Sequence, residues 1–410
     1  MHEYWILGAA GVLGLYMAWN IGANDVANAF GTSVGSGALT LRKALIVAAI
    51  FEFSGAFFVG AHVTDTVRKG IVDPMLFQND PDLFLYGMLS ALLAASIWIN
   101  IATYFGLPVS TTHSIVGAIV GFGLASGAGS ISWMKLVHIV LSWIISPIAG
   151  GIIAYLVFLA VQRKVLSSES PAASAVRFIP VIALLTFSSL ALAMIYKGLK
   201  PLKLNLPAPK AAVVSLAVGF IGMIAFYVAL RRFRKETNHE YDFVERNFKY
   251  LQVLTACYDS FAHGANDVAN AVGPVAAIFA IVKTGRIAAK VPVSPIILAI
   301  GGLGIVIGLA TWGYKVIETI GRRITELTPT RGFATEFASA TVVLFCSKLG
   351  LPVSTTHAQV GCTVGVGLAR GIAAINLRVV RNIILSWIAT LPISAAIAAG
   401  IYELLVHLFK

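Results

Sequence analysis

The sequence predicts an all-α, polytopic membrane protein of about twelve transmembrane helices, built as two inverted-topology repeats with discontinuous or re-entrant helices. Composition is the first reason. Of the 410 residues, 58% are hydrophobic and only 12% are charged, about half of the ~25% found in ordinary globular chains. The second reason is the length of the apolar runs. Residues 136–161 and 211–230 contain no Lys, Arg, Asp or Glu, and each is near the ~20 residues that cross ~30 Å of hydrocarbon.

The third reason is that two eight-residue motifs each occur twice. The sequence Gly-Ala-Asn-Asp-Val-Ala-Asn-Ala stands at 22–29 and, unchanged, at 264–271. The sequence Gly-Leu-Pro-Val-Ser-Thr-Thr-His stands at 106–113 and again at 350–357. We therefore expect a duplicated architecture. The stretches that follow the second motif are rich in Gly, so they are compatible with either a full crossing or a re-entrant hairpin.

These markers predict three parts: a first transport repeat over 1–161, a two-helix insert with a cytoplasmic linker over 162–245, and a second transport repeat over 246–410. Residues 231–249 hold six Lys or Arg, whereas the first 41 residues hold none. The positive-inside rule then places the N-terminus outside and this linker in the cytoplasm. The second repeat begins on the opposite side from the first, as in inverted-repeat transporters.

Net charge and cysteine content exclude other classes of protein. The charge of +12, from 30 Lys and Arg against 18 Asp and Glu, is explained by the basic cytoplasmic loops, so we expect a lipid bilayer and no nucleic acid as partner. The three cysteines, Cys257, Cys346 and Cys362, form neither a disulfide framework nor a metal cluster.

The first motif places a carboxylate in an apolar segment of each repeat, which is costly and usually marks an ion site. Each aspartate is flanked by two asparagines, and helical i, i+4 spacing puts both amides on one face. We expect Gly22 and Gly264 to let the helix open and free backbone carbonyls. Together these oxygens suit Na⁺. The alternative is a polar clamp between helices. The predicted cation-site residues are Asn24, Asp25, Asn28, Asn266, Asp267 and Asn270.

The second motif predicts the start of a helix, because Pro108 and Pro352 disfavour helix in the preceding residue and Ser or Thr is a preferred N-cap. Unpaired N–H groups and three hydroxyls make a donor-rich anion site, and two such sites facing each other could enclose one tetrahedral oxyanion. The alternative is ordinary capping near the lipid interface. The predicted anion-binding residues are Ser110, Thr111, Thr112, Ser354, Thr355 and Thr356.

The two motifs together predict a symporter. Aspartates repel an oxyanion unless cations lie between them, so cation binding should raise anion affinity and the reverse. Neither motif contains Lys or Arg. His113 and His357 are either anion donors or contacts between helices. Glu52, Asp259 and Glu336 are candidates for extra ion or proton sites, or for protonated structural groups. No nucleophile elbow surrounds the Ser and His residues, so we expect no enzyme.

The paired motifs resemble those of the inorganic phosphate transporter (PiT) family. The resemblance implies a cation-coupled phosphate symporter of about twelve helices in the plasma membrane, and a homodimer. It also implies cation sites at Asp25, Asn28, Asp267 and Asn270, with the six Ser and Thr residues around phosphate. We expect phosphate and Na⁺ as transported solutes, with no resident cofactor. Coupling to H⁺, or transport of another oxyanion such as sulfate, is the alternative.

Overall fold

The computed structural model describes residues 2–60, 71–127, 131–195, 206–234, 239–287, 293–348 and 353–410. Within these ranges the chain is almost entirely helical, and its only β pairing is an isolated bridge between Val72 and Ile131. The predicted all-α fold class is therefore confirmed. Residues 350–352 of the second motif, including Pro352, lie outside the described ranges.

The helices of the first half of the chain recur in the same order in the second half. The first half comprises α1 (His2–Ile21), η1 (Gly22–Val26), α2 (Ala27–Gly35), α3 (Leu41–Val59), η2 (Pro74–Phe77), α5 (Pro81–Tyr104), α6 (Thr111–Ala125) and α7 (Trp133–Val161). The second half comprises α10 (Glu240–Thr284), α11 (Pro295–Trp312), α12 (Tyr314–Glu318), η6 (Thr319–Arg323), α13 (Pro329–Lys348), α14 (Thr355–Ala369), η7 (Ile372–Ala374) and α15 (Leu377–Phe409). Between the halves lie η4 (Gln162–Leu166), α8 (Pro171–Ala193) and α9 (Ala208–Arg234).

Eight helical segments of the described ranges are long and apolar enough to cross a membrane, which confirms a multi-pass membrane protein. Four further helices are α3 and α13, which carry the buried glutamates Glu52 and Glu336, and α6 and α14, for which the sequence left a full crossing or a re-entrant hairpin open. Helices α6 and α14 have 15 residues each. At ~1.5 Å per residue each is about 22 Å long, short of the ~30 Å hydrocarbon core.

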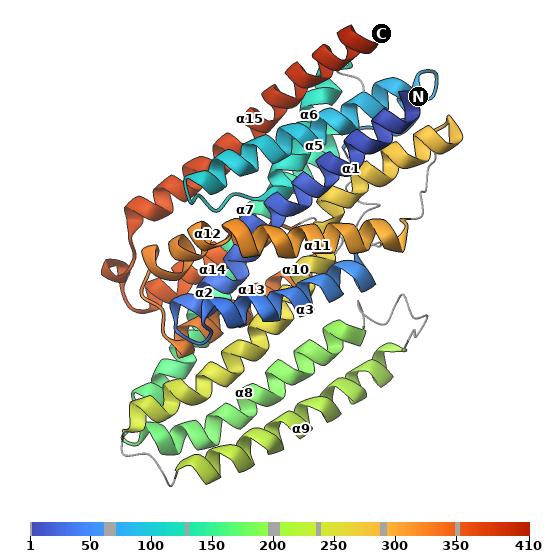
Figure 1. The fold of residues 1–410 in the computed structure, drawn as a ribbon. Coiled ribbons are helices and arrows are strands. Elements are labelled where there is room, and N and C mark those ends of the chain that lie inside the picture. Colours follow the sequence, from blue (N-terminus) through green and yellow to red (C-terminus); the bar gives the residue numbers. More distant parts are fainter. Residues whose placement is uncertain are drawn as a thin grey trace.

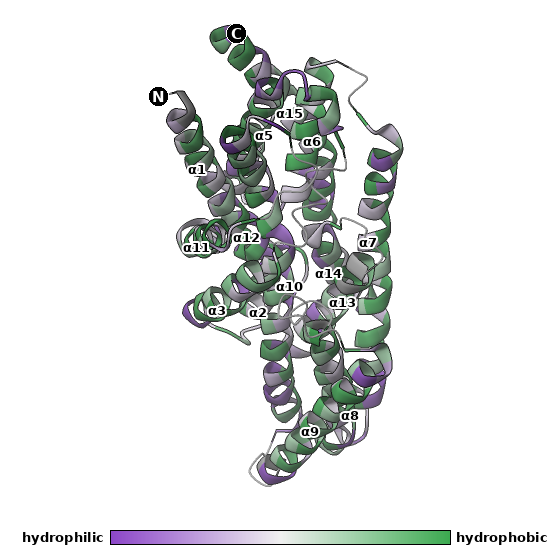
Figure 2. Ribbon diagram, turned by 90° about the vertical axis from the view of Figure 1, so that its right-hand side faces the viewer, coloured by the Kyte–Doolittle hydropathy of each residue, from purple (hydrophilic) through white to green (hydrophobic). Residues whose placement is uncertain are grey.

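The outer faces of the molecule are apolar. Figure 2 shows hydrophobic residues along α7 and α9 on the sides that face away from the other helices. Large apolar side chains such as Ile144, Ile148 and Ile152 of α7 are more than half exposed, as are Ile221 and Ile224 of α9. This is the surface that lipid is expected to cover.

The two halves run in opposite directions. In Figure 1, α1 leads away from the end of the molecule marked N, whereas the colour order of α10 leads back toward that end. Both termini lie at this same end (Figures 1 and 2). Helices α8 and α9 pack against each other at the far side of α10, outside the paired halves.

Each half contributes a short helix that packs on the last helix of the other half: α6 lies against α15, and α14 lies against α7. Glycines allow the close approach. A Cβ on Gly121 would lie 2.1 Å from the backbone oxygen of Ala395, and a Cβ on Gly365 would lie 2.1 Å from that of Gly151. Equivalent positions in these two contacts are 244 residues apart, the same spacing as the two copies of the second motif.

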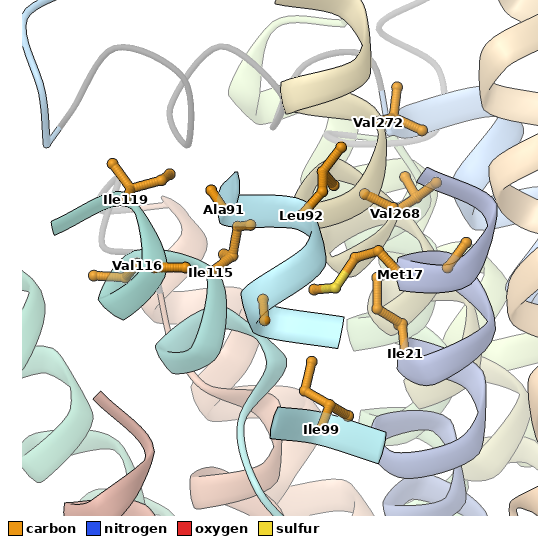
Figure 3. Packing of buried hydrophobic residues seen from close by; sticks show 14 of the residues in the cluster. Met17, Ile21, Ala91, Leu92, Ile99, Ile115, Val116, Ile119, Val268 and Val272 are labelled. Atoms are coloured by element: carbon orange, nitrogen blue, oxygen red, sulfur yellow. The ribbon is translucent and has the colours of Figure 1, made fainter. Parts of the chain in front are cut away.

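The core beside the site is a continuous apolar cluster from both halves. Figure 3 shows Met17 and Ile21 of α1 near Leu92 of α5 and Val268 of α10, with Ile115 of α6 beside Ala91 in the same cluster. These side chains are all fully buried. The cluster packs α1, α5, α6 and α10 together. Of these helices, α6 and α10 carry predicted polar residues, and α1 leads directly into η1, which carries Asn24 and Asp25.

The expectation that Gly22 and Gly264 both open their helices is correct for one copy and wrong for the other. The first copy widens into the π-helical turn η1, but α10 stays α-helical through the second copy. Both glycines have another role. A Cβ on Gly22 would lie 1.8 Å from the backbone oxygen of Ile305, and one on Gly264 would lie 2.1 Å from that of Glu52, so each glycine lets two helices touch.

Candidate functional site

Both Ser-Thr-Thr motifs begin a helix inside the protein, as predicted. Ser110 is the N-cap of α6, and its Oγ accepts a hydrogen bond from the backbone N–H of His113 at 3.2 Å. Ser354 caps α14 in the same way, accepting from His357 at 3.2 Å. The two serine hydroxyls therefore satisfy helix-terminal N–H groups, and the threonines that follow are the ones that reach the aspartates.

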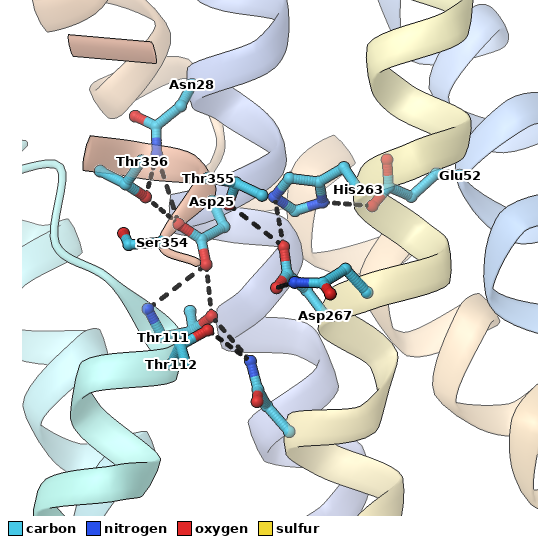
Figure 4. Close-up of polar contacts among 12 residues, drawn as sticks. Asp25, Asn28, Glu52, Thr111, Thr112, His263, Asp267, Ser354, Thr355 and Thr356 are labelled. Carbon is cyan, nitrogen blue, oxygen red and sulfur yellow. Dashed lines mark hydrogen bonds and ion pairs between the residues drawn. The ribbon is translucent and has the colours of Figure 1, made fainter. Parts of the chain in front are cut away.

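Asp25, at η1, lies between the two motifs (Figure 4) and is 2% exposed. Its Oδ2 accepts from the hydroxyl of Thr111 and from the Thr111 backbone N–H at 3.3 Å. Its Oδ1 accepts from the hydroxyl of Thr356. One carboxylate thus holds hydroxyls from α6 and α14, which come from opposite halves of the chain.

Asp267 of α10 is the corresponding carboxylate of the second half, and it is fully buried. Its Oδ2 accepts from Thr355 Oγ1 at 3.3 Å and lies 2.9 Å from His263 Nε2. Its Oδ1 accepts from Asn266 Nδ2 at 3.1 Å. The two predicted aspartates therefore share one polar centre with threonines of both motifs.

The asparagines four residues along each motif cross between the halves. Asn28 donates from Nδ2 to Thr356 Oγ1 at 2.9 Å. Asn270 donates to Thr111 Oγ1 and Thr112 Oγ1, each at 3.3 Å. The structure thus brings the predicted cation-site and anion-site residues together in one place.

Asn24 lies at the edge of this centre, and its side chain forms hydrogen bonds with the backbone. Its Nδ2 donates to Thr103 Oγ1 at 2.9 Å and to the carbonyl oxygen of Leu107 at 3.0 Å, and its Oδ1 accepts from the backbone N–H of Val109 at 3.0 Å. These three bonds fix the segment that leads into α6. In this arrangement Asn24 acts as the clamp that was the alternative interpretation of the motif.

The electrostatics of the centre require a positive partner. One ligand atom each of Asp25, Asp267 and His263 lies within 4.8 Å of the other two, and all three residues are buried. In the described part of the chain no Lys or Arg forms an ion pair with either aspartate. Two carboxylates this close repel strongly in a medium of low dielectric. Carboxylate, amide and hydroxyl oxygens are the ligands that suit a small hard cation.

His263 is a site residue that the sequence analysis missed. Besides approaching Asp267, its Nδ1 lies 2.7 Å from Glu52 Oε1, and Glu52 Oε2 accepts from Ser260 Oγ at 3.0 Å (Figure 4). A carboxylate–imidazole–carboxylate chain results. The sequence held a signal for it: Asp259, His263 and Asp267 are spaced four residues apart on one helical face.

Glu336 of α13 lies in a separate buried cage. Its Oε1 accepts from Thr32 at 2.7 Å, Ser33 at 2.6 Å and Gln252 at 3.1 Å, and its Oε2 accepts from Thr255 at 2.8 Å. Of the three extra carboxylates, the structure therefore joins Glu52 to the central site and places Glu336 in its own hydroxyl-rich pocket. Asp259 is 7% exposed and stands one turn before His263.

The motif histidines lie behind the threonines in an aromatic stack. His113 stacks on Trp143 with ring centroids 3.4 Å apart, His357 stacks on Trp387 at 3.7 Å, and the two imidazoles meet edge to face at 4.2 Å. His357 Nδ1 also lies 3.1 Å from the carbonyl oxygen of Trp143. This fits the interpretation of both histidines as contacts between helices.

Comparison with known proteins shows which family the chain is similar to. A model of the phosphate transporter family matches residues 21–398. A Pyrococcus abyssi protein described as a putative phosphate permease is 49% identical over 397 residues, covering 96% of each chain. The chloroplastic inorganic phosphate transporter 2-1 of Arabidopsis thaliana is 46% identical over 420 residues, covering 94% of this chain and 70% of that one. The solved structure of a sodium-dependent phosphate transporter is similar with a TM-score of 0.91 and 44% identity, covering 99% of this chain and 100% of that one.

Proposed function

We propose that this chain, which belongs to the phosphate transporter family and is a multi-pass protein of the cell membrane, carries inorganic phosphate into the cell together with Na⁺. One observation carries the proposal. The carboxylate of Asp25 accepts hydrogen bonds from Thr111 and Thr356, which are hydroxyls of both anion motifs. A cation bound to Asp25 and an anion bound to the two threonines would therefore use side chains that are hydrogen-bonded to one another.

This arrangement supplies a mechanism for coupling. While Asp25 accepts from the two threonines, their O–H groups are not available to an oxyanion. When a Na⁺ ion binds to the Asp25 carboxylate, it replaces the two threonine hydroxyls as the partner of that carboxylate. The hydroxyls then become free to donate to phosphate. Asp267 and Thr355 repeat the arrangement in the second half. Phosphate affinity then rises with Na⁺ occupancy, and by linkage Na⁺ affinity rises with phosphate.

The geometry also supports alternating access between the halves. Thr356 of α14 bonds to residues of the first half, and Thr111 and Thr112 of α6 bond to Asn270 of the second half. We propose that residues 1–161 and 246–410 act as the two repeat units, with 162–245 as an insert outside them. Rocking of one unit against the other would separate these cross-contacts and open the site to one side. Homodimer formation stays a prediction from the resemblance.

Na⁺ is the proposed coupling ion because amide and carboxylate oxygens suit a metal ion better than a proton relay. The structure that is similar at a TM-score of 0.91 is of a sodium-dependent phosphate transporter. Membrane potential would assist: two Na⁺ carried with one monovalent phosphate move a net positive charge inward, worth ~2.3 kcal/mol per 100 mV.

The test is radiolabelled phosphate uptake into proteoliposomes with Na⁺ and H⁺ gradients imposed separately. We expect accumulation above the external concentration under the Na⁺ gradient, and none under the H⁺ gradient alone. Accumulation driven only by H⁺ would replace Na⁺ by H⁺ as the coupling ion. Sulfate in excess should not reduce the uptake; if it does so as well as unlabelled phosphate, the site selects oxyanions generally.

A further inference from the structure

A second polar cavity lies apart from the central site, at one end of the molecule. It has a volume of about 400 Å³ and is formed by the end of α2, by the segment from η6 toward α13, and by the turn before α15. We name it the arginine cavity. Its lining residues are Gly35, Gly321, Arg322, Arg323, Ile324, Thr325, Glu326, Leu327, Ala373, Ala374, Ile375 and Asn376.

The cavity opens at the end where α10 begins. Glu245 of α10 accepts from the backbone N–H of Thr330 at 2.9 Å, just beyond the cavity, and Gln252 accepts from Ser36 at 2.7 Å, next to Gly35. The start of α10, from Glu240, belongs to the basic 231–249 segment of the sequence, so by the positive-inside rule this end faces the cytoplasm.

The charge of the cavity is positive. Arg322 and Arg323 lie in the lining with Glu326. Beside the cavity stand Arg331 and Arg370, together with Glu318 and Glu245, so four arginines against three glutamates leave a surplus of one positive charge. Glu326 is held by Arg331 at 3.2 Å and Arg370 at 3.0 Å. The hydrogen bond and charge of Arg331, with Arg370, hold the pKa of the Glu326 carboxyl below its usual range, so it stays paired and ionised.

The two arginines of the lining remain available to a ligand. Arg323 pairs with Glu318 at 2.7 Å, but both side chains are about half exposed, and such surface pairs contribute little. Arg322 is exposed and forms no ion pair or hydrogen bond within the described ranges. Asn376 accepts from Val379 through Oδ1, which leaves its amide N–H groups free to donate. Arginine guanidinium groups favour phosphate and carboxylate oxygens.

The inner wall of the cavity is continuous with the central site. Helix α2 runs from Asn28, at the site, to Gly35, at the cavity, a rise of about 10 Å at ~1.5 Å per residue. The wall is closed by backbone contacts between glycines and by the buried side chain of Ile320. A Cβ on Gly35 would lie 2.2 Å from the backbone oxygen of Gly321, and a Cβ on Gly321 would lie 2.3 Å from that of Gly31. Separation of α2 from η6 would therefore connect the two sites directly.

We propose that the arginine cavity is a second phosphate-binding site on the cytoplasmic side, which receives the anion as it leaves the central site. The identification of the anion as phosphate rests on the proposed function. The chemistry of the arginine cavity differs from that of the central site in one testable respect. The central site lacks Lys and Arg and depends on Na⁺, whereas the arginine cavity supplies its own positive charge and binds phosphate without Na⁺.

The experiment measures equilibrium binding of radiolabelled phosphate to the full-length protein in nanodiscs of neutral lipid, with Na⁺ replaced by K⁺. The wild type should bind phosphate, and binding should weaken as KCl is raised, because exposed charges are screened. The double variant R322Q/R323Q should bind at least about tenfold more weakly, since hydrogen bonds to charged groups are lost. The variant D25N should keep this Na⁺-independent binding.

The matched control is R378Q/R381Q, which removes two exposed arginines of α15 near the same end but outside the cavity lining. It should bind like the wild type. Three results would overturn the proposal: no binding without Na⁺, equal loss in R378Q/R381Q, or full binding in R322Q/R323Q. Binding retained in nanodiscs that contain anionic lipid supports free phosphate as the occupant. Loss of phosphate binding in these nanodiscs would indicate that a lipid headgroup occupies the cavity, and it would also overturn the proposal.

The outcome is separable from that of the proposed function. If Na⁺-driven uptake by the wild type fails while Na⁺-independent binding depends on Arg322 and Arg323, the central mechanism is wrong and the cavity stands. If Na⁺-driven uptake by the wild type succeeds but binding without Na⁺ does not depend on Arg322 and Arg323, only the cavity assignment is wrong. If both hold, R322Q/R323Q should also slow efflux of phosphate from preloaded proteoliposomes more than it slows uptake.

Discussion

At the scale of the residue, the threonines are the groups through which anion and cation meet. Thr355 donates to Asp267 at 3.3 Å in a site where no Lys or Arg of the described ranges assists. Thr355→Val should raise the phosphate KM about tenfold or more, by loss of one hydrogen bond to a charged group, while kcat changes little. Initial rates of uptake under a fixed Na⁺ gradient measure this.

The matched control for that variant is Thr341→Val, which removes a half-buried hydroxyl of α13 that bonds to the backbone of Phe337. Its KM should equal that of the wild type. An unchanged KM in Thr355→Val would remove Thr355 from the anion site, and an equal rise in both variants would indicate a general effect on folding.

His263 should matter for stability as well as for transport, because it is the shared partner of two buried carboxylates. His263→Ala leaves Glu52 and Asp267 without it, and breaking a buried ion pair typically costs about 3–5 kcal/mol. Thermal unfolding of the purified protein in detergent should therefore shift several degrees down. The double variant Glu52→Gln with His263→Gln should lose less, since one unpaired charge is removed. A melting temperature of His263→Ala equal to that of the wild type would contradict this role.

The role of a residue can be predicted from the sequence when its hydrogen-bond partner lies only a few residues away along the chain. The caps Ser110 and Ser354 were predictable because each bonds a backbone N–H three residues ahead. A clamp was one of two interpretations of the motif that contains Asn24, but its partners were not predictable, since they lie 79 to 85 residues away. The link from His263 to Glu52 spans 211 residues, so only the tertiary fold brings them together.

At the scale of the element, one eight-residue motif adopts two backbone forms, which composition and periodicity do not predict. The first copy widens at η1, whereas α10 continues unbroken. The residue before each motif differs. His263 contacts Asp267 one turn along and so ties together the α-helical turn across the second copy, whereas Ile21 stands at the equivalent place in the first. Tertiary contacts of this kind override local propensity.

The contact between α6 and α15 gives a prediction at this scale. Gly121→Ala would place a Cβ 2.1 Å from the Ala395 oxygen, and such overpacking typically costs about 1–3 kcal/mol. We expect a lower unfolding temperature and slower transport, because α6 carries the first anion motif. Thermal unfolding and uptake are measured together.

Gly11→Ala is the control for this substitution. Gly11 lies on α1, where a Cβ would meet nothing within 4 Å, and Ala in place of Gly favours a helix by up to ~1 kcal/mol. It should be neutral or stabilising. If Gly121→Ala unfolds at the same temperature as Gly11→Ala, the tight contact of α6 with α15 is not required.

At the scale of the whole molecule, duplication explains why two sequence-distant motifs form one centre. The halves run in opposite directions, so each motif approaches the other from the opposite side (Figure 1). This opposition was predictable from the basic linker and the absence of Lys and Arg before residue 42. Charge repulsion predicted that the two sets of residues share one cavity. Which threonine bonds to which aspartate or asparagine of the other half was not predictable, because spacing along the chain carries no information on contacts between halves.

The most direct test of the account is the phosphate affinity of purified protein as Na⁺ is varied at constant pH and ionic strength, in the R322Q/R323Q background that leaves the central site alone. We predict that saturating Na⁺ lowers the phosphate Kd at least about tenfold, a coupling of ~1.4 kcal/mol or more, and that D25N abolishes the effect. A phosphate Kd that stays the same when Na⁺ is fully replaced by K⁺ would contradict the central claim that bound cations raise the affinity of the site for the anion.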